Sequence, residues 1–350
     1  MLASTSAAAN RLVLPLLVPL LLIGYLMTSF PYPPSQPIIY TSLSSLPRSC
    51  SSWTVYPEDF YPGGAYVTLP YGRVRYWMIG PENGTKVIFI HGLSIPAIIW
   101  KDVAPVLASR GYRVLLYDLY GRGYSDAPKM IYDVSLYTTQ LALLMQHINW
   151  NSAHIIGLSM GGAIAAAFSV QFPQLVNDKV ALIASAGVVE SSDISRTAKI
   201  MSSPIVQTIS SLPPFRHYMR RLANASSISE GGPIDPIQQI IRLQSAHLPY
   251  FNAAVASSLR DGPIRGQEYA FKALGNSTQQ VLLIHGTADQ TVPYKYASKI
   301  QGLVPHLELM TIEGCGHDLT ITHASEVSYL LLRFLSSNNK STADGQAVLI

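Results

Sequence analysis

Apolar and polar positions first alternate strictly along this chain and then give way to unbroken apolar runs. Residues 65–69 and 73–79 alternate with a period of two and are separated by Pro70, Tyr71 and Gly72. Strict alternation over runs of this length predicts half-buried strands, and a short turn between two such runs predicts an antiparallel hairpin. We therefore expect a hairpin at the edge of a sheet.

Beyond Gly84, short apolar runs alternate with stretches of helical periodicity. The apolar runs are residues 87–90, 112–117, 154–156, 180–183, 281–284 and 307–310. The helical stretches are residues 100–110, 136–148, 160–172, 294–302 and 325–335. Continuous apolar strands are buried on both faces, so this alternation predicts an α/β protein with a mostly parallel sheet and helices on both faces. Ligands of such sheets bind at the carboxyl ends of the strands.

Residues 188–271 interrupt this alternation. The segment has helical periodicity but contains helix breakers such as Leu212-Pro213-Pro214 and Gly231-Gly232-Pro233. We expect a helical cap inserted between two parts of the α/β core, residues 58–187 and 272–337. Four aromatic residues of the cap are candidates for an apolar substrate pocket, and the alternative is that they form the cap's own small core. They are Phe215, Tyr218, Tyr250 and Phe251.

The N-terminal segment is apolar and uncharged from Leu12 to Phe30. Its length lies between that of a signal-peptide core and that of a full membrane span, and no small-x-small cleavage site follows it. We therefore expect residues 1–30 to be an uncleaved signal anchor in a membrane, although Pro15 and Pro19 each remove a helix hydrogen bond. Secretion after cleavage is the alternative.

Four Asn-x-Ser/Thr sequons follow the apolar segment, at Asn83, Asn224, Asn276 and Asn339. They agree with a glycosylated catalytic domain on the lumenal or extracellular side of the membrane. Residues 31–57 are rich in Pro and Ser, which favours an extended linker between membrane and domain. Residues 338–350 are expected to be a flexible tail.

The composition limits the classes of function. The 350 residues are 48% hydrophobic and 13% charged, which suffices for one large core with a small inserted domain. The net charge of +4 is spread along the chain, so no nucleic-acid partner is expected. Cys50 and Cys315 allow at most one disulfide, and the histidines show no metal-ligand spacing. We expect no metal and no other cofactor, and the oligomeric state stays open.

The motif Gly157-Leu158-Ser159-Met160-Gly161 lies where an apolar run passes directly into a helical stretch. Such a turn holds the serine in a strained conformation above the strand ends, and its glycines avoid collisions with neighbouring backbone. A serine hydroxyl reacts at neutral pH only with a positioned base, which itself needs an orienting carboxylate. Asp289 and His317 each follow a predicted strand, so we expect both at the same edge of the sheet as Ser159.

From about Tyr66 to Leu335, the chain resembles the α/β-hydrolase fold superfamily, and in particular its serine-nucleophile esterases and lipases with a helical cap. Besides the serine turn, the resemblance rests on three further motifs. They are His91-Gly92 after the first parallel strand, Tyr-Asp-Leu-Tyr-Gly-Arg-Gly-Tyr-Ser at 117–125 after the second, and the two turns that carry Asp289 and His317.

This resemblance implies roles for five residues. Ser159 would be the nucleophile, His317 the general base and later the acid, and Asp289 the carboxylate that fixes the imidazole tautomer. The backbone amides of Leu93 and Met160 would form the oxyanion hole.

Other residues compete for some of these roles. Asp118 and Asp126 also follow a strand, but the family uses this loop to shape structure. Glu190 follows the strand at 180–183, a position that some lipases use for the acid. His91 and His285 each precede a glycine at a strand end and are expected to be structural.

The serine narrows the reaction. Epoxide hydrolases and haloalkane dehalogenases of this fold use an aspartate nucleophile, so acyl transfer to water through an acyl-enzyme is the leading hypothesis. A membrane anchor and an apolar cap favour a lipophilic ester, such as a monoacylglycerol. The alternatives are a carbon–carbon bond hydrolase, a haloperoxidase-like enzyme, a thioesterase, an aminopeptidase or a non-catalytic binding module, because the fold alone does not name the reaction.

Overall fold

A computed structural model describes residues 5–29, 37–210 and 235–337 and divides the chain into two units, Met1–Ile38 and Ile39–Ile350. The first unit holds helix α1 (Thr5–Ser29), which contains Pro15 and Pro19. Within the three described stretches, no helix combines the length and hydrophobicity that crossing a membrane requires. The signal anchor predicted for residues 1–30 is therefore not supported by the structure.

The second unit is built on an eight-stranded sheet with the strand order β10-β9-β8-β7-β4-β5-β3-β2. Strands β2 and β3 form the predicted antiparallel hairpin at one edge, β3 is also antiparallel to β5, and the other neighbours are parallel. The strands are β2 (Gly64–Leu69), β3 (Gly72–Ile79), β4 (Thr85–Ile90), β5 (Tyr112–Tyr117), β7 (Ala153–Leu158), β8 (Val176–Ile183), β9 (Gln280–Gly286) and β10 (Glu308–Ile312).

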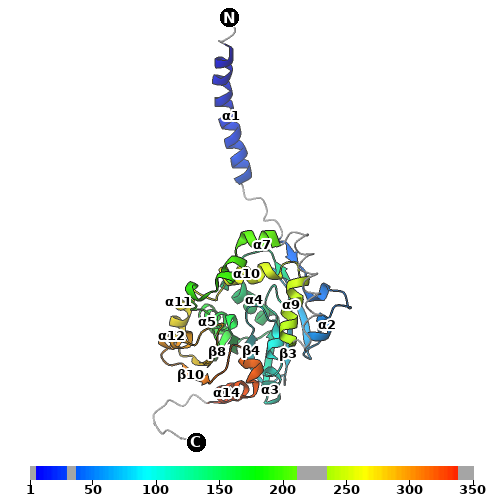
Figure 1. The fold of residues 1–350 in the computed structure, drawn as a ribbon, viewed down its shortest axis with the longest axis vertical. Helices are drawn as coiled ribbons and strands as arrows, with labels where there is room; N and C mark the ends of the chain where they lie inside the picture. Colours follow the sequence, from blue (N-terminus) through cyan, green and yellow to red (C-terminus); the bar gives the residue numbers. More distant parts are fainter. Residues whose placement is uncertain (1–4, 30–36, 211–234, 338–350) are drawn as a thin grey trace. The chain divides into compact units, whose positions relative to one another are not determined.

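Helices cover both faces of this sheet, as the apolar runs predicted (Figure 1). They are α3 (Ala104–Ser109), α4 (Val134–His147), α5 (Met160–Gln171), α11 (Glu268–Gly275), α12 (Lys295–Leu303), α13 (Leu319–Thr322) and α14 (Ala324–Ser336). Successive strand residues point to opposite faces, so Ile88 packs in the cluster with α4, α5 and α11, whereas Phe89 packs in the cluster with α3 and α14.

Residues 39–57 differ from the extended linker that their composition predicts. Strand β1 (Ile39–Tyr40) pairs with β6 (Ala127–Pro128), and helix α2 (Ser52–Val55) follows. The side chains of Leu43 and Tyr56 are fully buried in the core. The segment therefore belongs to the folded domain, because a few of its apolar side chains are buried in the core in spite of the surrounding prolines and serines.

Short 3₁₀ helices occur at Leu43–Ser45, Ala97–Trp100, Pro173–Leu175 and Ser191–Asp193.

The described residues between β8 and β9 form helices joined by turns and loops. They contain α6 (Arg196–Met201), α7 (Pro204–Ser210), α9 (Pro236–His247) and α10 (Phe251–Arg260), which we call the cap helices. Figure 1 shows α7 and α10 at one end of the domain, and α3 and α14 at the opposite end. The last helix of the predicted cap, α11, instead packs on α5 beside the sheet. Phe215 and Tyr218 lie outside the described residues.

Candidate active site

Ser159 occupies a strained turn between β7 and α5. Its φ of 55° and ψ of −118° lie in a region that residues other than glycine rarely adopt. The flanking glycines make the turn possible. A Cβ atom on Gly157 would lie 2.2 Å from the carbonyl oxygen of Gly161, and one on Gly161 would lie 2.2 Å from that of Ile90. The strain therefore presents the Ser159 side chain at the carboxyl end of β7, beside the start of a twelve-residue helix.

The structure joins Asp289 and His317, which follow β9 and β10. The Nδ1 atom of His317 lies 2.7 Å from Oδ2 of Asp289. The other carboxylate oxygen, Oδ1, accepts hydrogen bonds from the backbone amides of Thr291 and Val292, both at 2.8 Å. Burial by itself raises the pKa of Asp289, but the hydrogen bond from His317 and the two amides together hold the pKa below its ordinary value. Asp289 is therefore ionised at neutral pH.

The loops that carry these two residues are tied to each other. The amide of Ala288 donates to the carbonyl of Cys315 at 2.9 Å, and the amide of Gly314 donates to the hydroxyl of Thr287 at 2.9 Å. Gly286 leaves the space for this approach, because a Cβ atom there would lie 2.3 Å from the carbonyl oxygen of Cys315. The distance between Asp289 and His317 is thus fixed by the backbone.

Among the hydrogen bonds of the described residues, none joins Ser159 Oγ to His317. Such bonds are often long in ligand-free enzymes and shorten when substrate binds. The side chain of His317 is 25% exposed, whereas that of Asp289 is completely buried. The imidazole can therefore reach a substrate on one side while the carboxylate holds it from the other.

The predicted oxyanion loop follows β4 and lies against Ser159. A Cβ atom on Gly92 would lie 3.3 Å from Cβ and 3.8 Å from Oγ of Ser159. The amide of Leu119 donates to Nε2 of His91 at 2.9 Å, so the proton of this imidazole is on Nδ1, which donates to the carbonyl of Gly92 at 2.9 Å. Because a trans peptide places C=O and N–H on opposite sides, His91 turns the Leu93 amide away from itself.

Burial lowers the pKa of His91 to about 3, against a smaller opposing effect of its hydrogen bond to Gly92. The imidazole is therefore neutral at any pH near neutrality, which suits a role in holding a peptide plane. The second predicted oxyanion donor, the amide of Met160, stands at the start of α5.

The competing carboxylates have other partners. Asp118 is buried and accepts hydrogen bonds from the amides of Ala97 and Tyr124 and from the hydroxyl of Tyr56. Asp126 accepts from the amide of Arg73 and forms an ion pair with its side chain. Glu190 lies 3.5 Å from Nζ of Lys299, with its side chain 59% exposed. The carboxylate that contacts His317 is that of Asp289.

Two of the predicted pocket residues pack within the domain. The ring of Tyr250 stacks on Tyr40 at 4.8 Å between centroids with 5° between planes, and it lies 6.3 Å from the ring of Tyr132. Phe251 is only 3% exposed and belongs to a core cluster. These contacts match the alternative in which such rings hold the cap. The contact with Tyr40 was not predicted, since Tyr40 lies in the segment that was expected to be a linker.

The described residues contain no group of histidine, cysteine, aspartate and glutamate side chains that could hold a metal ion. Cys50 and Cys315 are both free thiols, so they do not form the single disulfide that the sequence allows.

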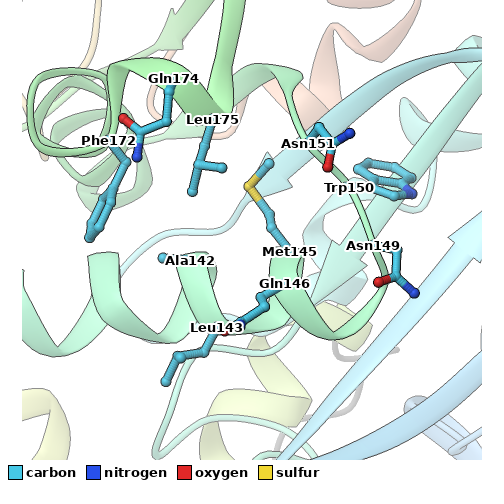
Figure 2. Close-up of a pocket in the computed structure, with 10 residues that line it drawn as sticks. All are labelled: Ala142, Leu143, Met145, Gln146, Asn149, Trp150, Asn151, Phe172, Gln174 and Leu175. Carbon is cyan, nitrogen blue, oxygen red and sulfur yellow. The ribbon is translucent and has the colours of Figure 1, made fainter.

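A groove of about 470 Å³ lies elsewhere, between the end of α4 and the turn that follows α5 (Figure 2). Met145, Trp150 and Leu175 line it, together with the amide side chains of Gln146 and Asn149. Met145, Gln146, Asn149 and Trp150 precede β7, and Leu175 precedes its parallel neighbour β8, whereas Ser159 follows β7. The groove is therefore at the opposite end of the strand from the candidate active site and contains none of the predicted site residues.

Comparison with known proteins agrees with this fold. The model of the alpha/beta hydrolase fold family matches residues 86–324. The chain therefore belongs to the α/β-hydrolase fold family.

Two relatives and one solved structure illustrate the range of the family. A non-heme chloroperoxidase from Streptomyces lividans is 28% identical over 290 residues, which cover 78% of this chain and 100% of that protein. A 2-hydroxymuconate semialdehyde hydrolase from a Pseudomonas species is 27% identical over 265 residues, covering 72% and 87%. The structure of the enol-lactonase from Burkholderia xenovorans superposes with a TM-score of 0.62 and 20% identity, covering 78% and 100%, and this likeness concerns the fold alone.

Proposed function

We propose that this protein is a serine hydrolase that cleaves carboxylic esters through an acyl-enzyme, with Ser159 as nucleophile, His317 as base and Asp289 as the orienting acid. The observation that carries the proposal is the strained serine turn at the same sheet edge as the 2.7 Å contact between His317 and Asp289. Family membership and the relatives support a hydrolase, and the geometry supports this choice of residues.

The chemistry follows from the protonation states. Asp289 is ionised and accepts a hydrogen bond from the N–H at Nδ1 of His317. Nε2 of the imidazole is therefore free to take the proton of the Ser159 hydroxyl. The serine oxygen adds to the ester carbonyl, and the amides of Leu93 and Met160 stabilise the negative oxygen. His317 then returns the proton to the leaving alcohol. A water molecule repeats the sequence, releasing the acid and restoring Ser159.

We further propose a lipophilic acyl group for the substrate. The support comes from the cap, where α6 and α7 expose apolar side chains to solvent: Ile200, Met201, Ile205 and Ile209. Apolar side chains gathered in this way are typical of surfaces that meet apolar ligands or lipids. A monoacylglycerol or a related acyl ester has the required chemistry.

A fluorophosphonate probe tests the nucleophile directly. We expect covalent labelling of the folded protein at Ser159, located by mass spectrometry, and no labelling of Ser159→Ala. A panel of p-nitrophenyl esters with acyl chains of 2 to 16 carbons then tests the substrate class. Folded protein that neither reacts with the probe nor cleaves any ester would favour a non-catalytic binding module.

Carbon–carbon bond hydrolysis is the second candidate, because the relative from Pseudomonas is named as a 2-hydroxymuconate semialdehyde hydrolase and is covered over 87% of its length. Both candidates predict labelling of Ser159. Turnover of 2-hydroxymuconate semialdehyde, followed by its absorbance, distinguishes them: fast loss of this compound together with negligible ester cleavage would replace our first proposal with the second.

A further inference from the structure

Arg122 is a fully buried cation between the sheet core and the cap. It lies in the turn that follows β5, and its guanidinium spans several elements. Its hydrogen bonds run from Nε to the carbonyl of Leu93 (2.8 Å), from Nη1 to the carbonyl of Tyr120 (3.0 Å) and the hydroxyl of Tyr137 (2.8 Å), and from Nη2 to the hydroxyl of Ser258 (2.7 Å).

All of these acceptors are neutral. Within residues 37–210 and 235–337, no carboxylate forms an ion pair with Arg122, and the rings of Tyr132 and Tyr137 lie 5.6 and 5.8 Å from its Cζ. Burying a charge without a counter-ion is costly, and an apolar side chain of similar length would fill the space without that cost. The guanidinium supplies instead a planar set of donors that reaches several elements at once.

One of these elements is the oxyanion loop, in which three consecutive carbonyls each accept a hydrogen bond from a side chain. His91 donates to Gly92, Arg122 to Leu93 and Gln244 to Ser94, at 2.9, 2.8 and 3.3 Å. The two soft dihedrals of Leu93 lie between the first two of these carbonyls. The direction of the Leu93 amide is therefore fixed from both sides.

Two of these three hydrogen-bond donors, Gln244 and Arg122, depend on the cap helices. Gln244 is a buried residue of α9, and its Oε1 atom also accepts from the amide of Gly123 at 2.6 Å. Ser258 is a buried residue of α10, and its hydroxyl contacts Arg122 and donates to the carbonyl of Ala254 at 2.7 Å. Helix α9 thus contacts the oxyanion loop directly through Gln244, and α10 contacts it through Arg122.

We propose that Arg122 is a positioning residue for the oxyanion hole, which orients the Leu93 peptide and couples it to the docked cap helix α10, while Gln244 of α9 holds the neighbouring Ser94 carbonyl. The proposal rests on the serine hydrolase function proposed above. Arg122 touches no reacting atom. It acts through the Leu93 carbonyl, so its loss should affect the transition state more than the binding of substrate.

The test compares variants that remove the guanidinium with a matched control. Arg122→Met removes all four hydrogen bonds, and Arg122→Lys keeps the charge but not the planar set of donors. Ser258→Ala and Gln244→Leu remove the links to the cap. The control is Lys179→Met, because Lys179 is also a buried cation that donates to backbone carbonyls, those of Phe334, Leu335 and Ser337, at the end of α14.

We expect Arg122→Met to lower kcat for p-nitrophenyl butyrate by about 10- to 100-fold with KM changed less than threefold, because losing one oxyanion donor outright costs on the order of 10²- to 10³-fold. Arg122→Lys should fall between this variant and the wild type, and the two cap variants should lose less. The rate of Ser159 labelling by fluorophosphonate should fall in parallel, because the probe places an oxygen in the same hole. Lys179→Met should lower the melting temperature while keeping kcat at 20 °C within twofold of the wild type.

Two results would overturn the proposal. One is normal kcat in Arg122→Lys or Arg122→Met, or, if both fail to fold, normal kcat in Ser258→Ala and Gln244→Leu together. The other is a loss of kcat in Lys179→Met as large as that in the Arg122 variants. That result would show that general destabilisation of the fold is enough to lower kcat. Wild-type protein that lacks both labelling and ester cleavage would instead refute the serine hydrolase function, and the role of Arg122 with it.

Discussion

Replacing Asp289 with asparagine tests the assignment of the catalytic acid most sharply, because the structure predicts which way the new amide must turn. Oδ1 accepts hydrogen bonds from the amides of Thr291 and Val292, so the oxygen of an asparagine must take that position. Its NH₂ group then faces Nδ1 of His317, where the carboxylate oxygen Oδ2 now lies at 2.7 Å. The opposite orientation would point NH₂ at two N–H donors.

The expected loss follows from this orientation. An NH₂ group that donates to Nδ1 forces the imidazole proton onto Nε2, and this atom can then no longer take the proton of Ser159. In the serine-protease triad the same exchange lowers kcat by about 10⁴-fold, which equals about 5.4 kcal/mol of activation free energy. The fold should lose much less, about 1–3 kcal/mol of unfolding free energy, because both backbone amides keep their acceptor.

The assay is kcat/KM for a short p-nitrophenyl ester, with the melting temperature measured on the same preparations. The matched control is Glu190→Gln, which also neutralises a carboxylate after a neighbouring strand, but one that is exposed and paired with Lys299. It should change kcat/KM less than twofold, because surface ion pairs contribute little. Turnover of Asp289→Asn within tenfold of the wild type would refute the tautomer argument, and loss of activity in Glu190→Gln would place the acid after β8.

Four further predictions concern the rest of the triad, a buried carboxylate and two aromatic residues of the cap. Ser159→Ala and His317→Ala should each reduce turnover at least as much as Asp289→Asn, and the double variant should lose little more, since residues that act as a unit are not additive. Burial raises the pKa of Asp118 from 3.8 to about 7 in spite of its hydrogen bonds. The folded state then binds this proton more tightly than the unfolded state between the two values, so the free energy of unfolding should fall as pH rises from about 4 to 7, and denaturant titrations of Asp118→Asn should lack this contribution. Phe251→Ala should destabilise the fold by about 3–5 kcal/mol. Tyr250→Ala removes the stacking on Tyr40 and should lower the melting temperature without changing the preference among acyl chain lengths, and a shift in that preference would instead assign its ring to the substrate pocket.

The sheet and its helices were predictable because the pattern of apolar residues within each strand indicates the strand without knowledge of the rest of the fold. A run such as residues 87–90 is apolar at every position, as a strand buried on both faces requires. Strand β4 begins two residues before this run and ends with it. Ser159, Asp289 and His317 could be placed at one edge of the sheet because each follows a predicted strand and the carboxyl ends of parallel strands meet at the same edge.

Contacts between distant segments were not predictable in this way. Residues 39–57 have the composition of a linker, and nothing nearby in the sequence indicates that the hydroxyl of Tyr56 meets Asp118, 62 residues away. The same limit applies to Arg122. The motif around it was recognised, but Ser258, which accepts from Arg122, and Gln244, which accepts from the amide of Gly123, lie more than a hundred residues further along the chain. Only the fold brings these residues into one network.

Three histidines of the described residues, His91, His285 and His317, lie at the end of a strand or in the loop after one, and the structure distinguishes them by burial and by the bonds of each ring. His91 and His285 are fully buried, and burial lowers the pKa of both. Each commits its single N–H to a backbone carbonyl, that of Gly92 for His91 and that of Val292, at 2.8 Å, for His285. A neutral ring bound in this way can orient a peptide but cannot carry a proton to a substrate. His317 differs in both respects, because its ring is partly exposed and its N–H faces an ionised carboxylate that stabilises the imidazolium. The buried rings therefore hold the backbone on either side of the site, the Gly92–Leu93 peptide and the turn that carries Asp289, while the exposed ring is the one equipped for acid and base catalysis.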